Sequence, residues 1–210
     1  DGAEVGFRVL VKAIQGQHTP RPAWVPFVGV HGGKLLGVTA TDYLQSADLI
    51  VRGLERAHAL YRPDGLPVVF DLQMEAEILN CRLHWANEVP PSVVSHPLMD
   101  GGRMEDLPDF DVTRGRFPLV REATGRLVNK LGGEIGFYGL ITGPFTLVSH
   151  LRGSDVFLDM LQAPEQVKEM MAFAAEAGKR TAEFYLESGC NIIAVVDPMT
   201  SQISLDHFAE

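Results

Sequence analysis

The chain has 210 residues, 46% of them hydrophobic and 21% charged, which is the composition of a soluble globular protein with one sizeable core or two small ones. Its 27 acidic residues outnumber its 18 basic residues, and a net charge of −9 without a cluster of lysines and arginines excludes a nucleic-acid surface and disfavours a membrane surface. No apolar run reaches the roughly 18–20 uncharged residues that cross a bilayer. Two cysteines cannot form a disulfide framework, so we expect a cytoplasmic protein.

Residues 1–24 are expected to form an N-terminal helix and a proline-rich lead-in. Residues 7–16 have apolar residues at helical spacing and stop at Gly16, and the charges among them argue against a secretory signal. The apolar run "VPFVGV" at 25–30 predicts a buried strand, and the "HGG" after it predicts a glycine loop.

The middle of the chain alternates helix and strand before an irregular excursion. Residues 39–61 predict a helix in one or two pieces, with Ser46 as a cap of the second piece. The predictions that follow are a strand over 66–71, a helical turn over 74–79, and an excursion over 81–116 with short strands at 81–85 and 91–96 and an irregular surface segment at 99–116.

The last ninety residues return to the alternation. The expected elements are a helix over 117–133, a buried strand over 134–142, a helix after Pro144, helices over 154–162 and 164–189, a buried strand over 190–198, and the start of a helix capped by Ser204.

Short apolar strands separated by helices predict an α/β fold with a parallel sheet covered by helices. The carboxyl ends of parallel strands form the ligand face, so we expect His31, Asp71, Thr142 and Asp197 to share one rim. Four strand–helix units are half of the eight that close a (β/α)8 barrel, and the sequence stops inside a helix pattern. We therefore expect an incomplete TIM barrel, about the first half or slightly more, in a single domain over residues 1–210; a complete open sheet of four or five strands is the alternative.

Four segments carry a resemblance to a known family. They are "VPFVGVHGGKLLGVTATDYL", "VVFDLQMEAEILNCRLHWANEVPPSV", "GLITGPFTLVSHLRG" and "ESGCNIIAVVDPMTSQIS". In these motifs and their order the chain resembles the uroporphyrinogen decarboxylase superfamily, which includes cobalamin-dependent methyltransferases acting on coenzyme M or tetrahydrofolate. The resemblance implies a (β/α)8 barrel of the uroporphyrinogen decarboxylase type, with its site at the carboxyl-terminal mouth.

Within this superfamily the chain is more similar to the methyltransferase branch. The decarboxylases follow their first strand with an arginine-rich segment that binds the carboxylates of the tetrapyrrole, whereas "HGGKLLGVTATDYL" has a single base, Lys34. Asp71 matches the conserved aspartate of the decarboxylases, and His150 falls where they carry a tyrosine. Gly143 and Pro144 are expected to turn the strand into a helix that brings His150 toward the cavity.

We accordingly expect Asp71 and His150 as catalytic residues and His31, Asp197 and Glu77 as substrate-binding residues. Each has a structural alternative. An aspartate after a strand often caps a helix, His31 can belong to a simple turn, and a lone histidine on an apolar segment is often a hydrogen-bonded core residue.

Glu75 and Glu77 alternate along one helical turn, so only one of them is expected at the site, and a solvated face is the simpler interpretation of both. Cys81 and Cys190 are expected to be buried thiols, and His84 and His96 to be surface residues.

The function implied by the resemblance is methyl transfer from a methylcobamide on a corrinoid protein to a small-molecule acceptor, a thiol or tetrahydrofolate. Such enzymes bind zinc through a His-x-Cys pair and a distant cysteine, and neither Cys81 nor Cys190 fits, so the metal ligands are expected beyond Glu210. One alternative is uroporphyrinogen III decarboxylation in porphyrin biosynthesis. The other is a non-catalytic half-barrel that binds a corrinoid or another ligand and acts through a partner. Such a half-barrel would self-associate into a homo-oligomer to cover its unpaired edge strands.

Overall fold

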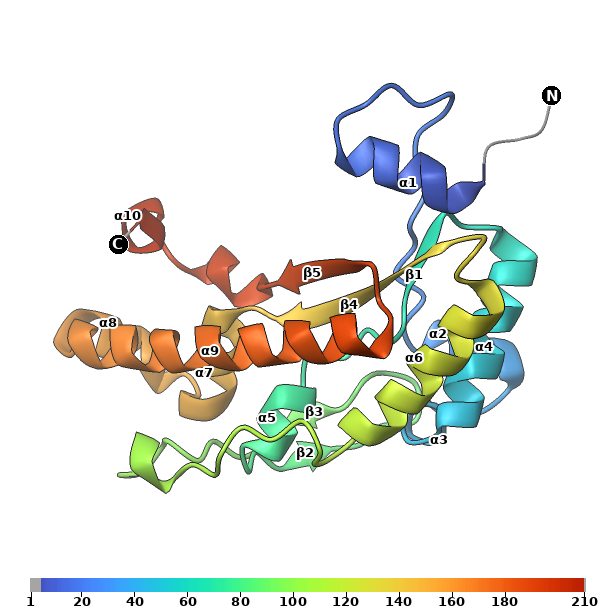
Figure 1. The fold of residues 1–210 in the computed structure, drawn as a ribbon. Helices are drawn as coiled ribbons and strands as arrows, with labels where there is room; N and C mark the ends of the chain where they lie inside the picture. The colour runs from blue at the N-terminus through green and yellow to red at the C-terminus, as the bar shows by residue number, and fades with distance from the viewer. Residues whose placement is uncertain (1–4, 210) are drawn as a thin grey trace.

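Three parallel strands form the centre of the molecule. In the computed structural model, which describes residues 5–209, strands β1 (Gly65–Pro67), β4 (Gly136–Thr142) and β5 (Ile192–Val196) lie in the order β1-β4-β5 (Figure 1). Both pairings are parallel, with Gly65 opposite Gly136 and Tyr138 opposite Ile192. The carboxyl ends of the three strands therefore meet at one edge of the sheet.

Helices surround this sheet and cover its ends. They are α1 (Gly6–Ile14), α2 (His31–Leu36), α3 (Ala40–Leu44), α4 (Ala47–Tyr61), α5 (Met74–Ile78), α6 (Phe117–Leu131), α7 (Pro144–Arg152), α8 (Asp155–Gln162), α9 (Pro164–Ser188) and α10 (Leu205–Ala209). Figure 1 shows α9 running along the sheet, α1 at the end where the strands begin, and α8 and α10 at the end where they finish. No helix within residues 5–209 is long and apolar enough to cross a membrane.

The central strand β4 is buried along its whole length and sets the packing of the core. Gly139 lies under the ring of Tyr185 on α9, and a Cβ atom at this position would lie 2.2 Å from Tyr185 Cγ. Only glycine allows this close approach of helix and strand. Phe117 on α6 packs edge-to-face on Phe184, which links α6 to α9.

The N-terminal lead-in is fastened to the start of β1. Arg21 donates to both carboxylate oxygens of Asp64 at 2.6 Å, and the backbone N–H of Trp24 donates to Asp64 Oδ2 at 2.8 Å. Burial raises the pKa of Asp64, but the bonds from Arg21 and Trp24 outweigh it and hold that pKa below its ordinary value. The predicted helix of the lead-in is confirmed as α1, and residues 1–4 lie outside the described part.

The predicted buried strand over 25–30 is wrong. The segment joins no sheet, Val28 N bonds back to the carbonyl of Pro26, and Phe27 is 57% exposed. Pro22 and Pro26 have no N–H to give a neighbouring strand, which explains why a ladder does not form. The predicted glycine loop at "HGG" is wrong as well, because these residues open helix α2.

Most other predictions of elements are confirmed. The 39–61 segment is divided into α3 and α4, and Ser46 Oγ accepts from Leu49 N at the start of α4. The long helix predicted over 164–189 is α9, with Gly189 in the left-handed conformation after it. The structure also contains the predicted helical turn, the helices predicted over 117–133 and 154–162, and the helix after Pro144. Ser204 caps α10 as predicted.

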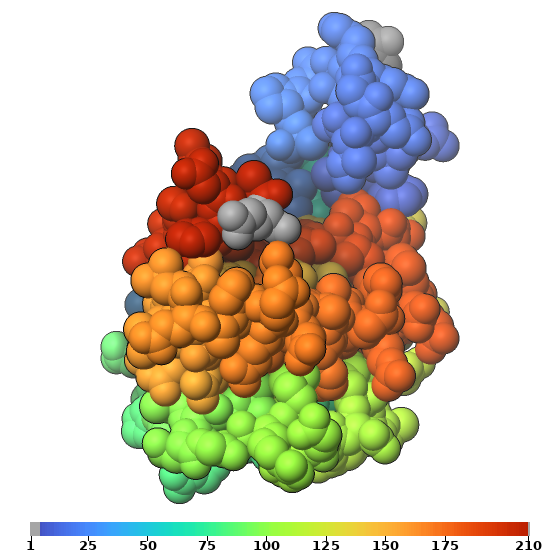
Figure 2. Space-filling model, turned by 90° about the vertical axis from the view of Figure 1, so that its left-hand side faces the viewer, coloured from blue at the N-terminus to red at the C-terminus, as the bar shows by residue number. Residues whose placement is uncertain are grey.

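The excursion over 81–116 forms a layer against α9, seen as the green segment below the orange helices in Figure 2. It contains the antiparallel pair β2 (Leu83–His84) and β3 (Ser92–Val93) and the 3-10 turn η1 (Met104–Asp106). Arg180 on α9 donates to the carbonyl of Phe110 at 3.0 Å. The prediction of a surface segment over 99–116 is wrong at two residues, because Phe110 and Arg116 are 7% and 6% exposed.

Two predicted strands differ in extent or burial. The ladder of β1 is only Gly65–Pro67, shorter than the strand predicted over 66–71, although Val68 N still donates to the carbonyl of Tyr138 on β4 at 3.3 Å. β5 was expected to be buried, yet Val195 is 61% exposed because β5 is an edge strand of the sheet. The 3-10 helix η2 (Pro198–Gln202) follows it. The described residues contain no closed barrel, and the division of the chain into domains stays a prediction.

Candidate functional site

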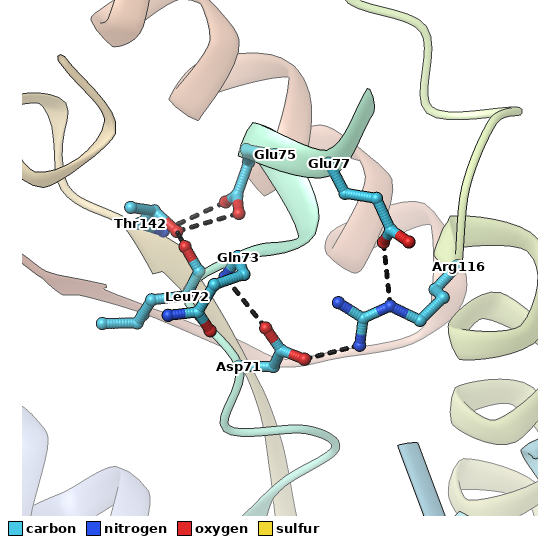
Figure 3. Close-up of polar contacts among 7 residues, drawn as sticks. All are labelled: Asp71, Leu72, Gln73, Glu75, Glu77, Arg116 and Thr142. Atoms are coloured by element: carbon cyan, nitrogen blue, oxygen red, sulfur yellow. Dashed lines mark hydrogen bonds and ion pairs between the residues drawn. The ribbon is translucent and has the colours of Figure 1, made fainter. Parts of the chain in front are cut away.

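A buried guanidinium lies between two carboxylates at the carboxyl end of β1 (Figure 3). Arg116 Nη1 lies 2.5 Å from Asp71 Oδ2, and Arg116 Nε lies 2.9 Å from Glu77 Oε2. The side chain of Asp71 is fully buried, whereas that of Glu77 is 26% exposed. The structure thus brings together two of the predicted site residues through an arginine from a distant part of the chain.

Local structure positions all three side chains. Asp71 Oδ1 accepts from Gln73 N at 2.8 Å, which fixes the turn between β1 and α5. Gly115 has φ of +58°, a left-handed conformation that turns the chain just before Arg116 and α6. The guanidinium carbon of Arg116 also lies 4.8 Å from the ring centre of Trp85, in cation–π contact.

Asp71 and Glu77 keep the guanidinium of Arg116 protonated. Burial lowers the pKa of Arg116, but the charges and hydrogen bonds of Asp71 and Glu77 more than compensate and raise it above its ordinary value. Arg116 Nη2 is buried, and no residue within 5–209 accepts a hydrogen bond from it. Two carboxylates against one guanidinium leave this cluster with excess negative charge, which suits the binding of polar N–H and O–H groups.

Glu75 on α5 adds a third carboxyl group to this region, beside the end of β4. Glu75 Oε1 accepts from Thr142 N at 3.0 Å, and Glu75 Oε2 lies 2.8 Å from Thr142 Oγ1. The two side chains leave α5 in different directions, Glu75 toward the end of β4 and Glu77 toward Arg116. The prediction of a solvated face is wrong for Glu75, which is 2% exposed, whereas the side chain of Glu77 is 26% exposed. Which of the two takes part in the site stays a prediction.

The aspartate after β5 is held by the first turn of α7. Asp197 Oδ1 accepts from the backbone N–H and hydroxyl of Thr146 at 2.8 and 2.6 Å, and Oδ2 accepts from Phe145 N at 3.0 Å. The N-cap residue of α7, Gly143, has no side chain that could accept a hydrogen bond. Asp197 therefore caps α7 in its place. A Cβ atom on Gly143 would lie 2.1 Å from Asp197 Cβ, which is why glycine precedes Pro144.

His150 lies on α7, facing the same region. Burial lowers the pKa of His150 to about 4, His96 contributes in the same direction, and Asp71 and Asp197 oppose it. The imidazole is therefore neutral at neutral pH, and its Nδ1 is buried without a partner among the described residues. His96, expected on the surface, instead donates from Nδ1 to the carbonyl of His150 at 2.7 Å, since a carbonyl can only accept.

His31 is in a different environment. It is the first residue of α2, and its Nε2 lies 2.8 Å from the hydroxyl of Tyr61, with the two rings stacked. Tyr61 ends α4, the helix that precedes β1. The described contacts join Asp71 to Glu77 through Arg116, and the charges of Asp71 and Asp197 act on His150, whereas His31 contacts Tyr61. The role of all five residues stays a prediction.

Comparison with known proteins decides the family. The model of the family described as "Uroporphyrinogen decarboxylase (URO-D)" matches residues 8–210. The chain belongs to the URO-D family.

The curated URO-D relatives that it resembles are methyltransferases by name. Methylcobamide:CoM methyltransferase MtbA of Methanosarcina acetivorans is 30% identical over 70% of this chain and 44% of the relative. Methylated-thiol–coenzyme M methyltransferase of Methanosarcina mazei is 28% identical over 80% of this chain and 44% of the relative. The chain thus spans about half the length of the curated relatives it matches.

A solved structure shares the fold. A methyltransferase from Methanosarcina mazei superposes on 98% of this chain and 63% of its own, with a TM-score of 0.86 and 22% sequence identity. Together with the parallel strands, this match establishes an α/β fold of the URO-D type over the part of the family structure that the chain covers.

Sequence reasoning missed three residues that contact the predicted site residues or their neighbours, namely Arg116, Glu75 and His96. Arg116 is 45 residues from Asp71 in the chain, so no local spacing connects them. A strand-end aspartate inside an apolar stretch needs either a cation or several hydrogen-bond donors, so the sequence indicated that Asp71 has a partner but not which residue it is.

The cysteines do not fit a zinc site. Cys81 and Cys190 are free and buried, and burial raises the pKa of each thiol to about 12, so neither is a thiolate. Among residues 5–209 no group of three histidine, cysteine, aspartate or glutamate side chains could hold a metal ion. Any zinc of the kind found in the methyltransferase branch would need ligands outside this part of the chain.

Proposed function

We propose that the protein containing this chain is a corrinoid-dependent methyltransferase. It would move a methyl group from a methylcobamide, carried by a corrinoid protein, to a thiol or tetrahydrofolate. The relatives named methylcobamide:CoM methyltransferase support this proposal. The strands β1, β4 and β5 with their intervening helices support the proposal that the chain forms part of a (β/α)8 barrel.

The charge of the cluster formed by Asp71, Glu77 and Arg116 is the observation that favours methyl transfer over decarboxylation. A substrate with eight carboxylates needs several free guanidinium groups. Here the buried Arg116 is already bound by Asp71 and Glu77, and helix α2, which replaces the arginine-rich segment of the decarboxylases, carries only Lys34. An electronegative site favours an acceptor that presents N–H, O–H or S–H groups.

The residues of this chain suit proton transfer from such an acceptor. A thiol becomes a strong nucleophile when it loses its proton. His150 is neutral and can accept the hydrogen bond of that S–H group, and the charges of Asp71 and Asp197 favour proton transfer to it against the lowering of its pKa by burial. In the transfer the sulfur forms a bond to the methyl carbon while the carbon–cobalt bond breaks and leaves its electron pair on cobalt. No zinc-dependent step is assigned to this chain, because its residues do not fit the metal.

The test uses the full-length protein that contains this chain. We expect it to bind zinc and to transfer methyl groups from a methylcobamide to coenzyme M or tetrahydrofolate, and Asp71→Asn and His150→Gln to slow the transfer by about 10²–10⁴-fold. The Arg126→Gln variant is the control, because Arg126 lies in an exposed ion-pair cluster. Carboxyl loss from a porphyrinogen, without methyl transfer, would overturn the proposal.

A second candidate is the non-catalytic half-barrel. The exposed edge strand β5 favours it, because a second copy of the chain could pair with that strand. A homo-oligomer that binds a corrinoid but transfers no methyl group would establish this alternative.

A further inference from the structure

The hydroxyl group of Thr142 has two neighbours that ordinarily only accept hydrogen bonds. Thr142 Oγ1 lies 2.9 Å from the carbonyl oxygen of Leu72 and 2.8 Å from Glu75 Oε2 (Figure 3). A hydroxyl carries one proton. If that proton goes to the Leu72 carbonyl, a good hydrogen bond to Glu75 Oε2 requires a proton on the glutamate.

The other oxygen of Glu75 is consistent with this assignment. Glu75 Oε1 accepts from Thr142 N at 3.0 Å, so this oxygen acts as the carbonyl of a carboxylic acid. The acid and Thr142 then form a directional chain, in which Glu75 Oε2–H donates to Thr142 Oγ1 and Thr142 Oγ1–H donates to the Leu72 carbonyl. Every donor in this chain has one acceptor.

Burial and nearby charge favour the same protonation state. Glu75 is 2% exposed, and its neighbours already include the buried carboxylate of Asp71. The single guanidinium of the cluster, Arg116, bonds to Asp71 and Glu77 and makes no bond to Glu75. A charged Glu75 would therefore be a third carboxylate beside one cation.

We propose that Glu75 is a carboxylic acid in the working protein and that its proton ties the loop carrying Asp71 to the end of β4. Leu72, which receives the last hydrogen bond, directly follows Asp71, and Thr142 is the last residue of β4. Glu75 is thus a positioning residue for Asp71.

The groups that act on Glu75 are Asp71 after β1, Thr142 on β4 and Tyr185 on α9. Arg116 and Cys190 lie next in line, where they act on Tyr185. Burial raises the pKa of Glu75, the bonds from Thr142 lower it, and Asp71 raises it further, with a net increase. The pKa values of Tyr185 and Cys190 are also raised, so both are neutral and supply no counter-charge.

The proposal has a definite pH dependence. Because the folded protein holds the proton of Glu75 more tightly than the unfolded chain, this group contributes stability that is full at acid pH. That contribution falls as pH rises from the ordinary pKa of a glutamate through the raised pKa of Glu75.

The experiment compares Glu75→Gln with the parent in the full-length protein, by infrared spectroscopy and by urea unfolding across pH. The parent should show the C=O stretch of a protonated carboxyl group at neutral pH, and E75Q should lose it while Glu77→Gln, on the same helix, retains it. The glutamine amide can donate to Thr142 Oγ1 while its oxygen accepts from Thr142 N. E75Q should therefore fold and lose the alkaline decline in stability that Glu75 causes, and its rate of methyl transfer shows whether Asp71 keeps its position.

A parent spectrum without the carboxylic-acid band, or an E75Q protein with an unchanged pH profile of unfolding, would overturn the proposal. If E75Q does not fold, Thr142→Val decides, because removal of the hydroxyl should shift the acid band to the frequency of a free carboxyl group. The activity measurement rests on the proposed function. The spectrum and the unfolding curves do not, so the two proposals can fail separately.

Discussion

The carboxyl ends of β1 and β5 each carry an aspartate, and the two aspartates are held by different kinds of partner. Asp71, after β1, lies against the charged guanidinium of Arg116. Asp197, after β5, accepts three hydrogen bonds from uncharged donors at the start of α7. Both residues obey the same sequence rule, an acid that ends an apolar strand.

The difference shows what an acid at the end of an apolar strand does and does not indicate. This pattern locates the edge of the sheet at which ligands bind, but it does not distinguish an acid in an ion pair from one that caps a helix. Asp71 is one of two carboxylates on a single cation and belongs to an electronegative cluster. Asp197 has each carboxylate oxygen engaged by the backbone of a neighbouring helix, so much of its role is to hold α7, and with it His150, in place.

The largest effect is expected from removing the cation at the β1 end. Arg116→Met should lower the free energy of unfolding by about 3–5 kcal/mol, because it leaves the buried carboxylate of Asp71 without a cation. Urea unfolding measures this loss. Arg126→Met, in an exposed ion pair, should cost under about 1 kcal/mol, and an equal loss in both variants would contradict the comparison.

At the β5 end, Asp197→Ala should cost about 2–3 kcal/mol, because the first turn of α7 loses three hydrogen bonds to a charged acceptor. Asp197→Asn keeps one acceptor oxygen and should cost less. Unfolding curves give the stabilities, and hydrogen exchange at Phe145 and Thr146 reports the cap directly. Unchanged exchange at these two amides in D197A would show that Asp197 does not hold the helix.

The charges of Asp71 and Asp197 both act on His150. The titration of His150 should contribute to the pH dependence of the free energy of unfolding. Its pKa is about 4 in the folded protein and 6.5 as a free side chain, so the unfolded chain binds more protons between these values. Stability should therefore be full above about pH 7.5 and fall by about 2 kcal/mol between about pH 7.5 and pH 5 on account of this residue. His150→Gln should remove that part of the slope, whereas His84→Gln, at an exposed position, should retain it. Equal slopes in the two variants would place His150 in a solvated environment.

The smallest effect is expected at the exposed arm of the Arg116 cluster. Glu77→Gln keeps an oxygen that accepts from Arg116 Nε, and Asp71 still neutralises the guanidinium. We expect a loss of about 0.5–1 kcal/mol in the free energy of unfolding. A loss as large as that of R116M would mean that Glu77, and not Asp71, is the main partner of the arginine.

Sequence patterns predicted the elements whose signals are local. The long helix α9 begins at a proline and stops at a glycine, and α4 begins at Ser46, so both could be located from the sequence. The run at 25–30 has the composition of a buried strand, but whether it pairs depends on neighbours and on the missing N–H of Pro26. Composition alone does not contain that information.

The candidate site was predictable where a residue type marks a strand end, as for Asp71 and Asp197. Its partners were not, because Arg116 lies 39 residues from Glu77 and 45 from Asp71. Glu75 was expected on a solvated face because alternate residues of a helix face opposite sides. That argument fails where the end of β4 covers the side of α5 that carries Glu75.

The cap that Asp197 places on α7 also has a consequence for how the chain is made. Asp197, which accepts the hydrogen bond of Phe145 N, is translated 52 residues after Phe145. At about 5–20 residues per second on the ribosome, that interval lasts several seconds. During this time the first turn of α7 has no side-chain cap, because its N-cap residue is Gly143. The β4–α7 unit is therefore completed by a residue of the strand unit that is translated after it.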